Sequence, residues 1–231
     1  MVKIKGKKGY FSVGEIVLWA SSLFLITLAF VLFDRQNYLS FISSLIGATS
    51  LIFNAKGNPI GQVLIVVFSV LYGIISWTYA YYGEMITYLF MTAPMAVLCL
   101  VEWLKNPYKN SRTEVKVNAV GGKEIVFALA LTLVITIIFY FVLQVFNTTN
   151  LFISTVSVAT SFFAAYLTFR RSPYFALAYA LNDIVLIVLW TLATIENLSY
   201  VSVIVCFFIF LINDVYGFIS WIKMQKRQAE N

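Results

Sequence analysis

Eight long apolar runs occupy most of this chain of 231 residues. A run of about 20 apolar residues crosses the ~30 Å hydrocarbon core of a bilayer as one helix. The runs are continuous rather than alternating, which disfavours a β-barrel. Hydrophobic residues make up 61% of the chain and charged residues 11%, too little polar surface for a water-soluble domain. The sequence therefore predicts an all-α integral membrane protein with eight transmembrane helices, at 15–33, 39–55, 61–82, 85–104, 124–146, 151–169, 174–194 and 199–222.

The basic residues predict how these helices are oriented. If both termini are cytoplasmic, every Lys and Arg except Arg35 falls in a cytoplasmic segment, as the positive-inside rule expects. An odd number of helices would place basic residues on both sides of the membrane. The basic residues are spread over separate short segments, so the net charge of +6 indicates membrane orientation rather than nucleic-acid binding.

Two parts of the chain repeat the same landmarks in the same order. Comparing 39–105 with 151–217 pairs Ala48-Thr49-Ser50 with Ala159-Thr160-Ser161, Pro59 with Pro173, and Trp77-Thr78 with Trp190-Thr191. Both copies start outside and end inside, so they are parallel repeats that need a connecting helix. We expect one transmembrane domain over 1–231, with a leading helix within 1–38, three-helix bundles at 39–105 and 151–223, and a linker helix at 124–146.

Only two carboxylates lie deep inside an apolar run, and each follows an asparagine: Asn182-Asp183 and Asn213-Asp214. A carboxylate in hydrocarbon costs on the order of 3 kcal/mol, so it normally faces a cavity or a partner. Helical rise places both aspartates ~14 Å from the cytoplasmic edge, near mid-membrane. Because the two helices are antiparallel neighbours, we expect the two pairs to form one polar cluster that contacts a ligand. The alternative is that these amides only fasten helix to helix.

Aromatic residues accompany these pairs. Trp190 follows Asn182 by eight residues and Tyr216 follows Asn213 by three, so each lies on the same face of its helix as the asparagine. Trp77 is the repeat counterpart of Trp190, and for both a stacking role competes with a position in the interfacial aromatic belt. Trp103 and Trp221 lie near helix ends, where the belt is the favoured interpretation.

Several function classes are excluded. The chain has no histidine, which rules out His-based zinc sites and general bases. It contains no phosphate-binding loop or dinucleotide motif. Cys99 and Cys206 are isolated within apolar runs and are interpreted as packing thiols. We expect no metal and no cofactor.

Three segments resemble the PnuC family of bacterial nicotinamide riboside transporters, and the likeness covers nearly the whole chain. The segments run from Tyr82-Gly83-Glu84-Met85 to Pro94-Met95, from Asn182 to Trp190, and from Asn213 to Arg227. The family is similar to full-length SWEET proteins, with two parallel three-helix bundles and a linker helix.

The resemblance implies facilitated diffusion of a nucleoside-like vitamin precursor across the bacterial inner membrane, made one-way by a cytoplasmic kinase, and a homotrimer. It implies a substrate site between the bundles, with Asn182, Trp190, Asn213 and Tyr216 as contacts. Asp183 and Asp214 would give polar support, and Trp77 and Tyr88 complete the candidate set. The family often has Asn where this chain has Tyr88, and Gln where it has Ala96.

These two departures keep the substrate open. Another nucleoside, a deoxynucleoside, thiamine or riboflavin is the alternative, and one aspartate could couple uptake to protons. A third hypothesis is an intramembrane enzyme that uses Asp183 and Asp214 as an acid and base pair.

Overall fold

The computed structural model describes residues 9–78, 81–195 and 197–230. Four lysines that support the predicted orientation lie outside these residues: Lys3, Lys5, Lys7 and Lys8. The described chain is helical apart from loops and one isolated bridge between Pro107 and Val115. The main elements are α1 (Val13–Phe33), α2 (Tyr38–Asn54), α3 (Ile60–Thr78), α4 (Tyr82–Ile86), η1 (Thr87–Thr92), α5 (Ala93–Lys105), α6 (Gly122–Val145), α7 (Leu151–Phe169), α8 (Tyr174–Thr194) and α9 (Val201–Ala229).

The prediction of an all-helical membrane protein is confirmed. Within the described residues, seven helical segments are long and apolar enough to cross a membrane, one of them being the continuous run of α4, η1 and α5. The eighth predicted span, α2, is a shorter apolar helix of 17 residues. The clearest difference from the predicted boundaries is that α9 continues to Ala229, well beyond residue 222.

Six of the described helices form a closed ring through their contacts with one another. Around the ring, α2 packs on α3, α3 on α5, α5 on α7, α7 on α8, α8 on α9, and α9 on α2. The first three contribute one half of the ring and the last three contribute the other. The halves therefore meet along two seams, one between α2 and α9 and the other between α5 and α7.

The two remaining helices lie outside the ring, each at one seam. Helix α1 packs on both α2 and α9, and α6 packs on α7 and touches α4. Each therefore precedes one half of the ring in sequence, and α1 covers the seam between α2 and α9 while α6 borders the other seam through α7 and α4. Most of the surface of α1 and α6 is apolar and exposed, as lipid contact requires.

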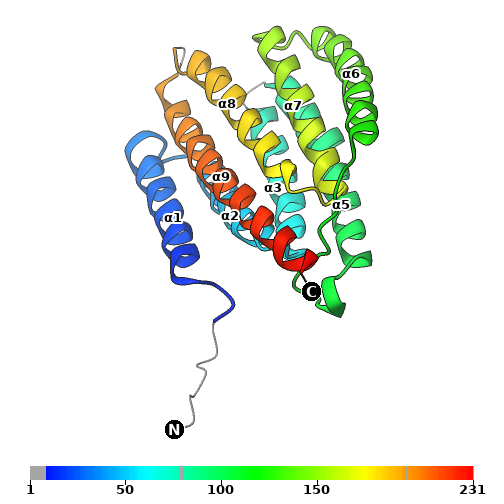
Figure 1. Cartoon of the computed structure of the whole chain (residues 1–231). Helices are drawn as coiled ribbons and strands as arrows, with labels where there is room; N and C mark the ends of the chain where they lie inside the picture. The colour runs from blue at the N-terminus through cyan, green and yellow to red at the C-terminus, as the bar shows by residue number, and fades with distance from the viewer. Residues whose placement is uncertain (1–8, 79–80, 196, 231) are drawn as a thin grey trace.

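The start of α1 and the end of α9 lie at the same end of the bundle (Figure 1). We name this the basic end, because Lys56, Arg170 and Arg171 follow helices there, and Lys105 and Lys226 lie in the last turns of helices there. We name the other the far end, which carries Arg35 after α1. At the basic end Ser12 and Glu15 form a capping box that starts α1, and Lys56 forms an ion pair with Glu15 at 3.0 Å.

Pro94 has a local structural consequence in the fourth span. Proline lacks the N–H that an α-helix needs, and here it stands at the first turn of α5, where that N–H is dispensable. The preceding turn, η1, is a π-helix, a widened turn that is frequent at functional sites. Tyr88 and Thr92 lie in this turn, so the distortion helps to place them at the centre of the ring.

Candidate functional site

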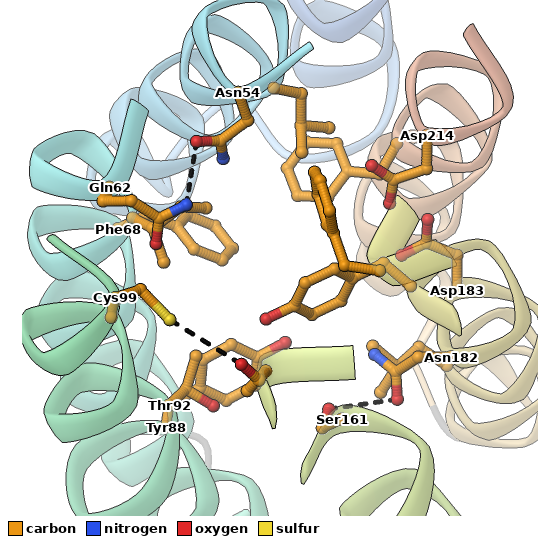
Figure 2. Close-up of a pocket in the computed structure, with 18 of the residues that line it drawn as sticks. Asn54, Gln62, Phe68, Tyr88, Thr92, Cys99, Ser161, Asn182, Asp183 and Asp214 are labelled. Atoms are coloured by element: carbon orange, nitrogen blue, oxygen red, sulfur yellow. Dashed lines mark hydrogen bonds between the residues drawn. The ribbon is translucent and has the colours of Figure 1, made fainter. Parts of the chain in front are cut away.

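The six-helix ring encloses a central cavity of about 70 Å³. All six ring helices and η1 contribute to its wall, and Figure 2 shows their side chains pointing into it. The polar members of this wall are Asn54, Gln62, Tyr88, Thr92, Ser161, Tyr179, Asn182, Asp183 and Asp214. A water needs about 10–15 Å³ of such space, so the cavity has room for several water molecules beside these groups.

Asp183 and Asp214 form the acidic wall of the cavity. Their carboxyl groups come from α8 and α9 and face each other in Figure 2. Both residues are almost fully buried. Asp183 Oδ2 accepts no hydrogen bond from an amide, hydroxyl or basic group in the described part of the chain. A buried carboxylate oxygen without a donor is costly, so this atom is free to accept a hydrogen bond from a bound molecule.

Asn182 lies beside the aspartates and is oriented by α7. Its Oδ1 accepts hydrogen bonds from Thr160 Oγ1 at 2.8 Å and Ser161 Oγ at 3.1 Å. Since the amide oxygen is held by these two hydroxyls, the amide nitrogen points into the cavity (Figure 2). The Asn182 side chain therefore presents a donor to the cavity, next to two acceptors.

The opposite wall carries a second polar pair. Gln62 Nε2 on α3 donates to Asn54 Oδ1 at the end of α2, over 2.9 Å. In Figure 2 this pair stands across the cavity from Asp183 and Asp214. Neither residue is among those predicted from the sequence. Their signal was an amide on each side of the Pro59 turn, which resembles ordinary turn composition.

Aromatic side chains close the cavity towards the far end. Trp190 lies one turn beyond the cavity residue Leu186 on α8 and is buried. Its ring packs against Tyr81 and Tyr200, with centroids 5.0 and 5.3 Å apart. Tyr72 extends this cluster to Tyr88 in the cavity wall, at 4.4 Å.

A second aromatic cluster closes the cavity towards the basic end. It consists of Trp103, Phe175 and Trp221, and both tryptophans are 0% exposed. Their interpretation as interfacial belt residues was wrong, because they lie inside the ring and not at its lipid surface. With closed clusters on both sides, the cavity is occluded. It is also smaller than the clefts of about 300–1,000 Å³ that hold small organic ligands.

The predicted site residues divide into two groups. Asn182, Asp183, Asp214 and Tyr88 line the cavity. The other four candidates lie elsewhere. Asn213 Nδ2 donates to Ser22 Oγ on α1 at 3.0 Å, the Tyr216 hydroxyl donates to Glu15 Oε1 at 3.0 Å, Trp190 belongs to the far-end cluster, and Trp77 is 62% exposed.

The cavity favours one kind of ligand chemically. Among the described residues that line it, two are carboxylic acids and none is basic. A phosphate group would need a cation or a helix N-terminus, whereas a cationic ring gains from two nearby carboxyls and from aromatic faces. Asn182, Gln62 and Ser161 supply hydrogen bonds for hydroxyls. Within the described residues no group of three metal-binding acids or thiols occurs.

Comparison with known proteins gives three findings. Residues 37–223 match the model of a family described as nicotinamide mononucleotide transporter. The nicotinamide riboside transporter PnuC of Neisseria mucosa is 25% identical over 201 residues, which are 85% of this chain and 76% of that protein. A solved structure, described as the crystal structure of the vitamin B3 transporter PnuC, aligns with a TM-score of 0.82. It is 24% identical, and the alignment covers 96% of this chain and 95% of that one.

Proposed function

The chain belongs to the nicotinamide mononucleotide transporter family, and on this premise we propose that it carries nicotinamide riboside across the bacterial inner membrane by facilitated diffusion. It is a multi-pass membrane transporter and not an enzyme. The hypothesis of an aspartyl enzyme built on Asp183 and Asp214 is therefore withdrawn.

The proposed substrate is chosen because of the charge of the cavity wall. Nicotinamide riboside contains a cationic pyridinium ring and a ribose, and it lacks the phosphate of the mononucleotide. Asp183 and Asp214 complement that cation, and the wall offers no described Lys or Arg to a phosphate. The unphosphorylated nucleoside therefore matches the chemistry of this wall better than the nucleotide in the family's description.

The transport cycle follows from the closed ring. The positive-inside rule puts the basic end in the cytoplasm. One three-helix bundle then consists of α2, α3 and α5, and the other consists of α7, α8 and α9. Rocking of these bundles would open the cavity to one side at a time. Phosphorylation by a cytoplasmic nucleoside kinase would trap the product inside, and the family resemblance suggests a homotrimer.

Uptake into proteoliposomes tests the proposal. Liposomes that contain the purified protein, trapped nicotinamide riboside kinase and ATP should accumulate labelled nicotinamide riboside saturably. Unlabelled nicotinamide riboside should compete, and a tenfold higher concentration of the mononucleotide should not. Equal competition by both compounds, or no saturable uptake, would refute the proposed substrate.

Two cavity residues leave other candidate substrates. Tyr88 and Ala96 both line the cavity, and they stand where the family often has Asn and Gln. Two amides are thus replaced beside the ligand, which would suit another nucleoside, a deoxynucleoside, thiamine or riboflavin. The same liposomes challenged with these compounds, with and without a pH gradient, would identify the substrate and detect coupling to protons.

A further inference from the structure

We propose that Trp103 and Trp221 are the gate residues at the basic end: each indole N–H holds one seam of the ring closed, and both bonds break when the cavity opens to that side. This inference rests on the proposed transport function. It assigns a role to two residues that do not line the central cavity.

Each tryptophan bridges the two halves of the ring. Trp221 Nε1 on α9 donates to the backbone carbonyl of Asn54 on α2, over 2.7 Å. Trp103 Nε1 on α5 donates to the backbone carbonyl of Thr168 on α7, over 3.0 Å. One bond thus closes the seam between α2 and α9, and the other closes the seam between α5 and α7.

The two bonds occupy equivalent positions in the two halves. The acceptors, Asn54 and Thr168, each stand five residues before the proline of the following turn, Pro59 and Pro173. Both donors lie towards the basic end of the last helix of their half. This correspondence indicates one device used twice, rather than two unrelated packing contacts.

The tryptophan rings also fill the space between the cavity and the basic end. Their centroids are 5.4 Å apart, and Phe175 packs edge-on against Trp221 at 4.9 Å. Trp103 stands one turn beyond the cavity residue Cys99 on α5. A solute leaving the cavity in this direction must therefore displace the pair of indoles.

Asn54 connects the gate to the cavity. Its backbone carbonyl accepts from Trp221, while its side chain lines the cavity and accepts from Gln62. A ligand that displaces the Gln62 amide would act on the residue that holds the Trp221 bond. The neighbouring Ser220 Oγ donates to the carbonyl of Ala55 at 2.7 Å and strengthens the same seam.

Cys99 serves as a native reporter of gate opening that does not depend on the substrate. With Cys206→Ala, Cys99 is the one cysteine left in the sequence, and it is 1% exposed in the occluded structure. A membrane-impermeant maleimide applied to the basic end should label it about fivefold faster in Trp221→Phe, the equivalent of about 1 kcal/mol for one hydrogen bond. In Trp103→Phe/Trp221→Phe the rate should rise roughly 25-fold if the two bonds contribute independently.

Trp19→Phe is the matched control. Trp19 Nε1 donates to Thr49 Oγ1 at 3.1 Å, so this variant also loses an indole hydrogen bond, but between α1 and α2 and outside the gate. Its labelling rate should stay within twofold of the parent. Wild-type rates in both gate variants, or an equal increase in Trp19→Phe, would overturn the proposal.

A disulfide lock tests the same gate without removing either tryptophan. A Cβ built at Gly217 lies 3.9 Å from Ala55 Cβ across the seam and 3.5 Å from Ala176 Cβ within the second half of the ring. Disulfides span about 3.5–4.5 Å between Cβ atoms. In a Cys99→Ala/Cys206→Ala background, Gly217→Cys can therefore be paired either with Ala55→Cys or with Ala176→Cys.

Oxidation of the pair at 55 and 217 should lower uptake at least tenfold while nicotinamide riboside still binds, and a reductant should restore uptake. The oxidised pair at 176 and 217 should transport within twofold of its reduced form. Full transport by the oxidised 55 and 217 pair would refute the gate. If the reduced proteins do not transport nicotinamide riboside, the proposed substrate fails, and the Cys99 labelling rates still decide the gate.

Discussion

Asn213 and Asp214 are adjacent in sequence but serve different interfaces: Asn213 Nδ2 donates to Ser22 Oγ on α1, while Asp214 lines the central cavity. Consecutive residues of an α-helix project about 100° apart, so one side of α9 faces α1 and the next faces the ring interior. For Asn213 the structure therefore favours helix fastening, with α1 as the partner rather than α8.

Replacing Asn213 should affect stability and leave substrate binding unchanged. Asn213→Ala removes the bonds to Ser22 Oγ and to the Ile209 carbonyl, and we expect a loss of about 1–3 kcal/mol in the free energy of unfolding. Thermal unfolding and titration with nicotinamide riboside would measure the two effects separately. A tenfold loss of affinity in a folded Asn213→Ala protein would show that this amide reaches the ligand.

Replacing the aspartates should affect binding according to the charge of the ligand. Asp183→Asn and Asp214→Asn keep the side-chain shape but remove the carboxylate, so affinity for cationic nicotinamide riboside should fall roughly 10- to 100-fold, or about 1.4–2.7 kcal/mol. Affinity for the uncharged dihydropyridine form of the same nucleoside should change less than threefold. Isothermal titration of both ligands is the measurement. Equal losses for the two forms would mean that the carboxyls act only through hydrogen bonds or packing.

Gly47 on α2 should be essential for the shape of the cavity. A Cβ at this position would lie 2.4 Å from Cζ of Phe210 and 3.1 Å from the Phe68 ring, and both rings line the cavity. Gly47→Ala should push Phe210 inward and lower substrate affinity at least fivefold. In Gly47→Ala/Phe210→Leu the shortened side chain should restore most of that loss. If the single variant binds normally, the ring relaxes without entering the cavity.

Trp190 and Trp77, which the predicted repeat pairs with each other, should differ in effect. Trp190 is 2% exposed within the far-end cluster, whereas Trp77 is 62% exposed. Trp190→Ala should therefore open the cavity to the far end, which would raise the labelling of Cys99 from that side several-fold. Trp77→Ala should leave the labelling unchanged. A reversed order of the two effects would contradict the closure of the cavity by the Trp190 cluster at the far end.

The helices were predictable because the hydropathy of each apolar run by itself indicates that the run lies in the membrane. Seven predicted spans coincide with described segments that are long and apolar enough to cross the membrane, and α2 is the shorter eighth. Asp183 and Asp214 could be selected for the same reason, since a carboxylate in an apolar run is conspicuous wherever the helix lies. Cytoplasmic termini and the two-bundle repeat stay predictions.

Other site residues could not be selected from local patterns. Asn54 and Gln62 flank a turn, where amides are common, and only the closure of the ring brings them opposite the aspartates. Tyr216 looked equivalent to a cavity residue, but its side of α9 meets Glu15 of the leading helix. Trp103 and Trp221 lie near helix ends, as interfacial tryptophans do, but the packing of the two halves of the ring buries them.

The sequence by itself determined the membrane environment, the number of apolar helices and the acidic pair in their interior, because hydropathy and the cost of a buried charge act on each segment separately. The tertiary structure alone decided which side of each helix faces the cavity, which faces α1, and where indoles tie the halves together. Those outcomes depend on contacts between residues far apart in sequence, 167 positions for Asn54 and Trp221 and 65 for Trp103 and Thr168, and no local pattern records such a contact.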